Sequence, residues 1–339
     1  PSSLGRGRNK FMADLLRFTS KGIYCEVGDF YIDPWKSVDR AVITHAHADH
    51  ARAGHSSYLA HPYTTAVMQY RLGNKNQYES INYGEKKKVG DVYVTFYPAG
   101  HAIGSSQILI EDSQERWIVT GDYKLEDDGF SEPFEHVQCD VFVTESTFAL
   151  PIYNWKKQTE VVKEIKEWFL QNQESNTTSI ITCYSFGKAQ RLIDVLHKAG
   201  IGPILVYGSI YNINQALIKA GVRLHNCQTT NLENKELFSK AVVLAPQSAT
   251  RTTWVNRFKK RSIASASGWM QVRGHRRRMA LDRGFVLSDH ADWKGILKAI
   301  DKSQADTILA THGYASQLVK YLNQEKKKEA YVLETLLNE

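Results

Sequence analysis

The chain has 339 residues, 42% of them hydrophobic and 23% charged, and a formal net charge of +7. This length permits a large core and more than one domain, and the composition excludes an intrinsically disordered chain. No apolar run approaches the roughly 20 residues of a membrane-spanning helix, and no signal-peptide pattern is present, so we expect a cytoplasmic protein with no membrane partner. Four widely spaced cysteines indicate reduced thiols.

The chain begins with a basic, glycine-containing stretch, residues 1–10, which predicts a flexible arm or a cloning remnant. Short apolar strands and turns alternate from there to about residue 150, with a helix expected over 64–72. The expected strands are 30–33, 41–44, 92–97, 108–111, 117–120 and 141–145.

Strong metal-binding side chains follow the strand expected at 41–44: His45, His47, Asp49 and His50. Imidazole suits zinc and related ions and a carboxylate can bridge a second ion, so this cluster predicts a site for two divalent metal ions. Four side chains rarely complete two coordination shells, so further ligands must come from later segments. The candidates at the ends of later strands are His101, Asp122, His290 and His312.

A single histidine after a strand is usually a packed or capped surface residue, and this explanation competes with metal binding. Agreement among several strand ends favours metal binding for the residues just named. The remaining histidines lack such partners and are interpreted as structural: His55, His61, His136, His197 and His225.

The pattern changes after residue 150, where an apolar helical face is followed by alternating strands and helices. The face comprises Val161, Val162, Ile165, Trp168 and Phe169. Strands are expected at 179–183 and 204–207 and helices at 188–199 and 212–220, which indicates a parallel-sheet α/β module. Site-like motifs return after the strands expected at 285–287 and 307–310. We therefore interpret residues 151–283 as a domain inserted into one formed by residues 11–150 and 284–339.

A basic run lies near the end of this insertion: residues 251–283 contain ten Lys or Arg and one acidic residue, Asp282. Such a face attracts nucleic-acid phosphates, although a charge run is more often a solvated surface. Because the run leads directly into the His290 motif, we favour phosphate binding.

These motifs resemble a known family. Asp33 after a strand, the cluster from His45 to His50, His101 and Asp122 resemble the metal site of the metallo-β-lactamase fold. Glu145, His290 and His312 resemble further motifs of the β-CASP nucleases, which carry an inserted second domain. The resemblance implies an α/β protein, an αββα metallo-β-lactamase sandwich with an inserted α/β β-CASP domain.

Segments 24–35, 266–274 and 283–293 look like those of the bacterial ligase-associated DNA exonucleases, and the likeness extends from Phe11 to the C-terminus. It implies exonucleolytic cleavage of DNA in repair, and a functional association with a DNA ligase. His312 resembles the RNA-processing members, but Tyr314 stands where those usually carry an acid. An RNA-processing nuclease is therefore the alternative. A small-molecule metallohydrolase would not need the insertion, and a non-catalytic binding module would not need every ligand position filled.

The resemblance also implies a role for each metal ligand. His45, His47 and His101 would hold one metal ion, and Asp49, His50 and His312 the other, with Asp122 between them. Zinc is favoured by the imidazoles, and manganese is the alternative.

The catalytic set comprises His290, Glu145, Asp33 and Asp49. His290 is the expected general acid, with a purely structural histidine as the alternative. Glu145 would orient a histidine through a hydrogen bond, and Asp33 would hold the metal loop from behind or simply cap it.

Ser185, Gly187 and Lys188 open an expected helix, whose free N–H groups can bind an anion; Ser185 as a simple N-cap is the alternative. Together with Ser267 and Gly268, they are expected to hold a substrate phosphate in a cleft between the domains. The strand backbone would be held by Arg273, Arg276, Arg277 and Arg278. Such contacts predict weak sequence preference and strong salt dependence.

Overall fold

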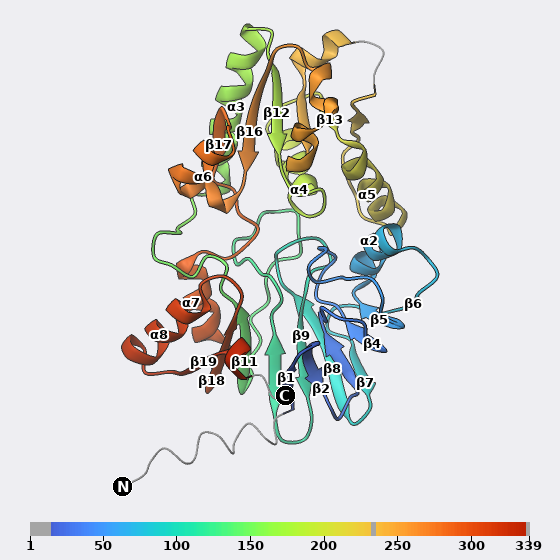
Figure 1. The fold of residues 1–339 in the computed structure, drawn as a ribbon, viewed down its shortest axis with the longest axis vertical. Helices are drawn as coiled ribbons and strands as arrows, with labels where there is room; N and C mark the ends of the chain where they lie inside the picture. Colours follow the sequence, from blue (N-terminus) through green and yellow to red (C-terminus); the bar gives the residue numbers. More distant parts are fainter. Residues whose placement is uncertain (1–14, 232–234, 337–339) are drawn as a thin grey trace.

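The computed structural model describes residues 15–231 and 235–336, so the arm expected at 1–10 lies outside the described residues. The side chains of residues 275, 276, 335 and 336 are also outside the description. Three sheets and their helices form the described part of the chain, which confirms the expected α/β class (Figure 1). No helix among the described residues has the length and apolarity to cross a membrane.

The first two sheets form the lower half of the molecule in Figure 1. The first has the order β1 (Arg17–Thr19), β2 (Gly22–Cys25), β3 (Phe30–Ile32), β4 (Arg40–Val42), β5 (Ser57–Ala60) and β6 (Gln77–Ser80). The second has the order β19 (Glu329–Val332), β18 (Thr307–Thr311), β11 (Val141–Glu145), β10 (Arg116–Val119), β9 (Ser106–Glu111), β8 (Val92–Pro98) and β7 (Lys86–Val89).

These two sheets pack face to face and are covered by helices on their outer faces. Phe30 and Ile32 of the first sheet share a core with Val94 and Ile110 of the second. The other face of the first sheet packs against α2 (Pro62–Leu72), and that of the second against α7 (Trp293–Ser303) and α8 (Ala315–Glu325). The resulting order of layers is helix, sheet, sheet, helix.

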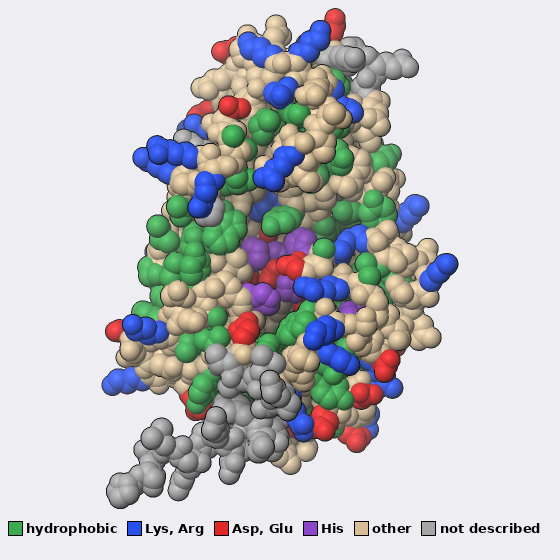
Figure 2. All heavy atoms as spheres, viewed as in Figure 1, with side chains coloured by type: hydrophobic (Ala, Val, Ile, Leu, Met, Phe, Trp, Pro, Cys, Tyr) green, Lys and Arg blue, Asp and Glu red, His purple; other side chains and the backbone are tan. Residues whose placement is uncertain are grey.

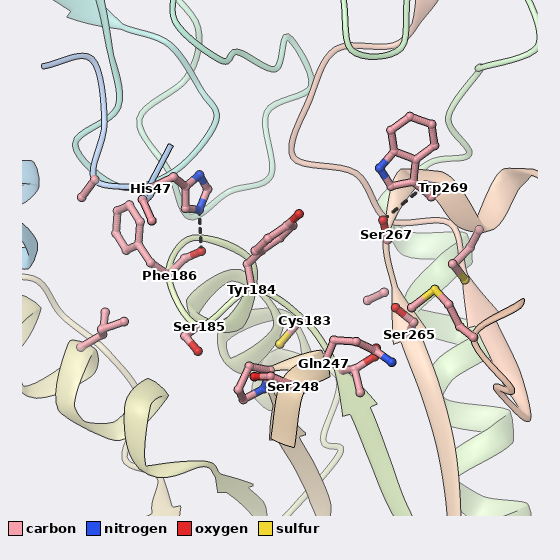
Figure 3. Close-up of a pocket in the computed structure, with 18 of the residues that line it drawn as sticks. His47, Cys183, Tyr184, Ser185, Phe186, Gln247, Ser248, Ser265, Ser267 and Trp269 are labelled. Carbon is pink, nitrogen blue, oxygen red and sulfur yellow. Dashed lines mark hydrogen bonds between the residues drawn. The ribbon is translucent and has the colours of Figure 1, made fainter. Parts of the chain in front are cut away.

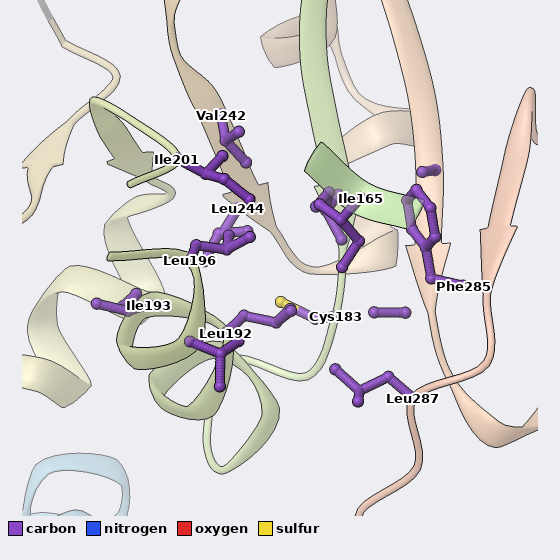
Figure 4. Packing of buried hydrophobic residues seen from close by; sticks show 14 of the residues in the cluster. Ile165, Cys183, Leu192, Ile193, Leu196, Ile201, Val242, Leu244, Phe285 and Leu287 are labelled. Carbon is purple, nitrogen blue, oxygen red and sulfur yellow. The ribbon is translucent and has the colours of Figure 1, made fainter. Parts of the chain in front are cut away.

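The third sheet forms the upper half and is wholly parallel. Its order is β14 (Gln228–Thr229), β13 (Ile204–Val206), β15 (Val242–Ala245), β12 (Thr178–Thr182), β16 (Arg261–Ala266) and β17 (Arg283–Phe285). Its helices are α3 (Gln158–Glu174), α4 (Lys188–Lys198) and α5 (Gly208–Lys219). Ile165 of α3, Leu192 and Leu196 of α4 and Phe285 of β17 meet in one core (Figure 4). The opposite face packs against short 3₁₀ segments through Phe238 and Phe258.

Two strands that are neighbours in the second sheet lie before and after the whole third sheet in the sequence. β11 pairs with β18 in parallel, Val141 opposite Thr307, although all strands of the third sheet lie between them along the chain. The chain therefore leaves the lower half after β11 and returns before β18. This path brings loops from both halves to one place.

Several element boundaries differ from those expected. The strand expected at 41–44 ends at Val42, which leaves Thr44 and His45 in a loop. The helix expected at 212–220 begins four residues earlier, at Gly208, because Tyr207 in extended conformation starts it. Strands β5 and β6 were not expected, since neither alternates cleanly, and β16 was missed because its Ser and Ala residues lack an apolar pattern.

Candidate metal centre

Asp33 organises the loop that follows β4. It directly follows β3 and has a φ of +42°. Its Oδ1 accepts a hydrogen bond from the backbone N–H of Thr44 (2.8 Å), and its Oδ2 accepts from the Thr44 hydroxyl (2.5 Å) and lies 2.7 Å from Nδ1 of His50. Asp33 therefore lies behind the loop and orients His50.

Three imidazoles converge beyond this loop. Nε2 of His45 lies 3.0 Å from Nδ1 of His47, and Nε2 of His101 lies 3.1 Å from the same atom. Oδ2 of Asp122, which follows β10, lies 3.5 Å from Nε2 of His45 and 3.8 Å from Nε2 of His101. Three nitrogens and one carboxylate oxygen thus point at a common volume.

The outer nitrogens of two of these rings are held by backbone carbonyls. Nε2 of His47 lies 3.0 Å from the carbonyl oxygen of Phe186 (Figure 3), and Nδ1 of His101 lies 2.7 Å from that of Asp289. A carbonyl can only accept, so each outer nitrogen must carry the proton. The inner nitrogens are then left as lone pairs that face one another.

Burial favours the neutral form of these imidazoles. It holds the pKa of His45 and that of His101 well below the usual value for histidine. The nearby His50 lowers the pKa of His45 further, and the nearby His290 lowers that of His101. Burial also lowers the pKa of His47. Neutral imidazole is the form that binds a metal ion, so these side chains need no deprotonation to become ligands.

Asp122 and His50 each stabilise the charged form of the other. Burial alone would raise the pKa of Asp122, but His50 and His290 outweigh it and hold that pKa well below its usual range. Burial opposes protonation of His50, yet Asp122 and Asp33 hold the pKa of His50 well above its usual value. A negative charge therefore remains next to the three neutral imidazoles.

This donor set fits a divalent cation. Facing lone pairs with no proton between them repel each other, and a cation among them removes that repulsion. Tetrahedral coordination by imidazole and carboxylate is typical of zinc. Within the described ranges, two groups of three or more such residues each bring their ligand atoms within 4.8 Å: His45, His47, His101 and Asp122, and Asp122, Glu145 and His290.

The residues expected at the second metal position are arranged more loosely. Nε2 of His50 lies 3.5 Å from Oδ2 of Asp122 and 3.9 Å from Oδ2 of Asp49, whose side chain is 73% exposed. The ring of His312, which follows β18 with a φ of +59°, stacks on His50 at a centroid distance of 5.9 Å. The four side chains line the same cleft.

Glu145 and His290 form a separate pair beside the imidazoles. Both carboxylate oxygens of Glu145, the last residue of β11, lie near Nδ1 of His290, at 2.9 and 3.0 Å. The backbone N–H of Tyr123 donates to the same carboxylate at 2.9 Å. Burial opposes protonation of His290, but Glu145 and Asp122 outweigh it and raise the pKa of His290 to about 9.

A cleft of about 310 Å³ opens over these side chains. Every expected metal ligand lines it except His45, which is fully buried. Residues of the lobe built on the third sheet also line it: Tyr184 after β12, Lys188 of α4, and Ser267 and Gly268 after β16. Figure 2 shows His side chains and acidic side chains gathered in this hollow at the middle of the face.

A larger cavity of about 630 Å³ continues from the cleft into the third sheet's lobe. It shares His47, Tyr184, Ser267 and Trp269 with the cleft and extends past Gln247 and Ser265 (Figure 3). Tyr184, which is 68% exposed, lines both spaces.

The residues expected to hold a phosphate are divided among different places. Ser267 and Gly268 line the cleft, whereas the Ser185 hydroxyl lies 2.8 Å from that of Ser209 in the larger cavity. Lys188 lines the cleft, but its Nζ is buried 2.8 Å from Oδ1 of Asp289. Gly187 borders neither space and instead faces His47.

The basic residues expected along the strand backbone lie farther out. Arg273, Arg277 and Arg278 are exposed on the short helix α6 (Arg273–Arg278), and the side chain of Arg276 lies outside the described residues. α6 follows the 3₁₀ segment Gly268–Gln271, whose Trp269 lines the cleft.

Among the described residues, none of the histidines interpreted as structural belongs to either group of potential ligands. His61 caps α2 by accepting the N–H of Tyr63, and His197 stacks on His225 at 3.8 Å. His55 is buried, and neither of its ring nitrogens has a hydrogen-bond partner among the described residues.

Two functional contacts were missed because backbone carbonyls make them: those of Phe186 and Asp289. No side-chain pattern marks a carbonyl that will accept from a distant histidine. Arg191 was also missed. It is 2% exposed within α4 and donates to the Ser288 carbonyl at 2.6 Å and to Oδ1 of Asp289 at 2.9 Å. Only its unusual place among apolar helix residues could have indicated a buried ion pair.

Sequence comparison relates the chain to proteins named for work on nucleic acids, although no model of a known protein family matches. A probable DNA ligase from Opitutus terrae is 26% identical over 316 residues, 93% of this chain and 30% of that protein. Endoribonuclease YSH1 from Gibberella zeae is 28% identical over 176 residues, 50% of this chain and 20% of that protein. An RNase J-like protein from Methanocaldococcus jannaschii is 24% identical over 192 residues, 48% of this chain and 44% of that protein.

The chain spans less than half the length of each of these relatives. Among solved structures, a protein of unknown function from Enterococcus faecalis V583 shares the fold, with a TM-score of 0.61 at 12% identity over 86% of this chain and 79% of that chain. These comparisons give the chain homologues named as a probable ligase and as RNA nucleases, and a fold that a crystallised protein shares.

Proposed function

We propose that the chain is a metal-dependent nuclease of the β-CASP group of the metallo-β-lactamase fold, which hydrolyses phosphodiester bonds of DNA. The observation that supports this most is the convergence of His45, His47, His101 and Asp122 beneath a cleft that both halves of the molecule line. The return of the chain from β11 to β18 supports a catalytic domain of residues 11–150 and 284–339 with an insertion of residues 151–283.

Two divalent ions bound here would activate water at neutral pH and neutralise charge on the phosphoryl oxygens. His45, His47 and His101 would hold the first ion and Asp49, His50 and His312 the second, with Asp122 between them. Zinc suits the imidazoles of the first position, and manganese suits the mixed oxygen and nitrogen donors of the second.

His290 is the proposed general acid. Its ring lines the cleft, and Glu145 holds its Nδ1, so that its Nε2 can present a proton to the departing oxygen. Because the pKa of His290 is raised to about 9, the imidazole carries that proton at neutral pH. Asp33 acts on the reaction through Thr44 and His50 rather than by touching substrate.

The larger cavity extends the path available to a nucleic-acid strand. Tyr184 and Trp269 place aromatic rings next to the metal cleft, where an unstacked base could lie against them. Ser267 and Gly268 are retained as phosphate contacts, and Ser185 and Lys188 border the same path.

DNA is favoured over RNA because the relative named as a probable DNA ligase aligns with 93% of the chain, whereas the RNA nucleases align with about half. A role in DNA repair alongside a ligase and exonucleolytic cleavage are part of this proposal. The RNA-processing alternative is favoured by the names of the other relatives.

The test is digestion of end-labelled single- and double-stranded DNA and of RNA of the same sequence, using metal-free protein to which Zn²⁺ or Mn²⁺ is returned. We expect metal-dependent shortening of DNA from one end. Cleavage of RNA alone would replace the DNA proposal with the RNA alternative, and no cleavage of either polymer would overturn the nuclease proposal.

A further inference from the structure

We propose that the first turn of α4 positions the ligands of the first metal ion, so that metal affinity depends on the lobe built on the third sheet. The inference deepens the proposed function and rests on it for the presence of the ion. It is carried by two chains of contacts that begin at neighbouring residues, Gly187 just before α4 and Lys188 at its start, and end at His47 and His101.

The first chain runs through the loop before α4. The carbonyl of Phe186, a buried residue in the loop before α4, accepts from Nε2 of His47 at 3.0 Å and thereby directs Nδ1 towards His45 and His101 (Figure 3). A hydrogen bond to the outer nitrogen of a metal-binding histidine fixes its tautomer and ring orientation. This one carbonyl therefore decides where the His47 lone pair points.

Gly187 allows that carbonyl to approach. Its φ of +81° and ψ of −81° are disfavoured for residues with a Cβ. A Cβ at this position would lie 3.1 Å from Cβ of Ala102 and 3.6 Å from Nε2 of His47. The backbone N–H of Gly187 donates to Oε1 of Gln190 at 2.7 Å, which fixes the turn from within the helix. The glycine thus packs against the residue next to His101 as well as against His47.

The second chain runs through Asp289. Its carbonyl accepts from Nδ1 of His101 at 2.7 Å, and its carboxylate is held by Nζ of Lys188 at 2.8 Å and by Nη1 of Arg191 at 2.9 Å. Lys188 also donates to the Leu287 carbonyl at 2.6 Å. All three charged side chains are at most 5% exposed, so water does not compete for these bonds.

Two of the three imidazoles of the first site are therefore oriented from one helical turn in the other lobe. The third, His45, has its Nδ1 3.1 Å from the hydroxyl of Thr44, within its own loop. A change in the first turn of α4 should loosen two ligands together without touching the metal. We assign Gly187 and Lys188 as positioning residues of this site.

The experiment is a Co²⁺ titration of metal-free full-length protein, followed through the visible absorption of the bound ion. Gly187→Ala is compared with Gly200→Ala, at the other end of the same helix, where φ is also positive (+66°) but an added Cβ meets nothing within 4 Å. Both variants carry backbone strain, and only the first disturbs His47. Outer-shell changes typically cost about 10–100-fold in metal affinity. We expect a loss of that size, and a changed absorption spectrum, for Gly187→Ala only.

Lys188→Met provides a second variant, which removes the bond to Asp289 while keeping the side-chain volume. It should also weaken Co²⁺ binding, whether or not Gly187→Ala folds. Equal affinities for the wild type and the folded variants at positions 187 and 188 would overturn this proposal and leave the nuclease proposal intact. A wild-type protein that binds no Co²⁺ would overturn both.

Discussion

The carboxylate of Asp33 reaches three partners at once, and Glu145 holds His290 with both of its oxygens. Neither residue lies among the imidazoles of the first site. At the residue scale, the candidate centre therefore consists of inner side chains that face a cation position and outer groups that fix their protonation and direction.

Replacing Glu145 by Gln should change the pH dependence of cleavage. The carboxylate raises the pKa of His290 to about 9, so the acid form persists below about pH 9 and is lost above it. Without that charge, the alkaline limb of the single-turnover rate should move to lower pH, and the rate should fall by about 10–100-fold. Glu160→Gln, on the exposed side of α3, is the control. An unmoved alkaline limb would remove Glu145 from this role.

His61 should make stability depend on pH. Burial lowers the pKa of His61 to about 4 from a usual value of 6.5, so the unfolded chain binds a proton that the folded chain excludes between these values. Stability is complete above about pH 6.5 and falls by up to about 3 kcal/mol towards pH 4. His61→Asn, which retains an N-cap side chain, should reduce this loss relative to the wild type in urea unfolding of metal-free protein. An unchanged pH profile would count against a buried neutral His61, and His197→Asn on the surface serves as the control.

Residues at strand ends could be proposed from sequence because each metal-binding motif is local. His45, His47 and His101 meet in space, and the carboxylate of Asp122 joins them. The hydrogen bonds between their outer ring nitrogens and backbone carbonyls could not be predicted, since these bonds depend on how the two lobes pack. Nor could sequence show that a Cβ at Gly187, a residue expected to touch phosphate, would lie 3.1 Å from Cβ of Ala102 and 3.6 Å from Nε2 of His47.

At the scale of elements, amphipathic spacing identified α3 well. Val161, Ile165, Trp168 and Phe169 are buried as the pattern predicts, and Val162 is partly exposed. Short strands were harder to predict, because β1 and β14 have only three and two residues and β5 shows no clean alternation.

Ile165→Ala should lower the free energy of unfolding by about 2–5 kcal/mol, because it leaves a cavity between α3 and the third sheet. Glu167→Ala, on the exposed side of the same helix, should change it by less than about 0.5 kcal/mol. Equilibrium urea unfolding measures both. If both substitutions lowered the free energy of unfolding by a similarly small amount, α3 would not pack on this core as described.

At the scale of the whole molecule, the order of motifs along the chain indicated that one segment interrupts another. That expectation depended on where ligands occur and on the change of pattern after residue 150. A cleft between the halves was expected from the family resemblance, but its shape could not be predicted, because its walls come from loops more than a hundred residues apart, such as those of His47 and Tyr184.

The exposed arginines of α6 should contribute to binding of single-stranded DNA. Changing Arg273, Arg277 and Arg278 together to Ala should weaken binding and reduce the slope of log affinity against log salt by about 2, at about 0.7 per lost phosphate contact. The matched control is Lys326→Ala, Lys327→Ala and Lys328→Ala together, before the first residue of β19 and distant from the strand ends that carry the site. Fluorescence anisotropy at several salt concentrations measures the slope. Equal slopes for both triple variants would show that α6 is only a solvated surface.

The central claim is that the converging imidazoles and Asp122 bind ions that are required for cleavage. The most direct measurement determines bound metal and DNA cleavage in the same preparations of wild type and Asp122→Asn. We predict that the wild type cleaves in proportion to bound metal, and that the variant loses metal and more than about 100-fold in rate. Undiminished cleavage by metal-free wild type, or by a variant that has lost its metal, would contradict the account.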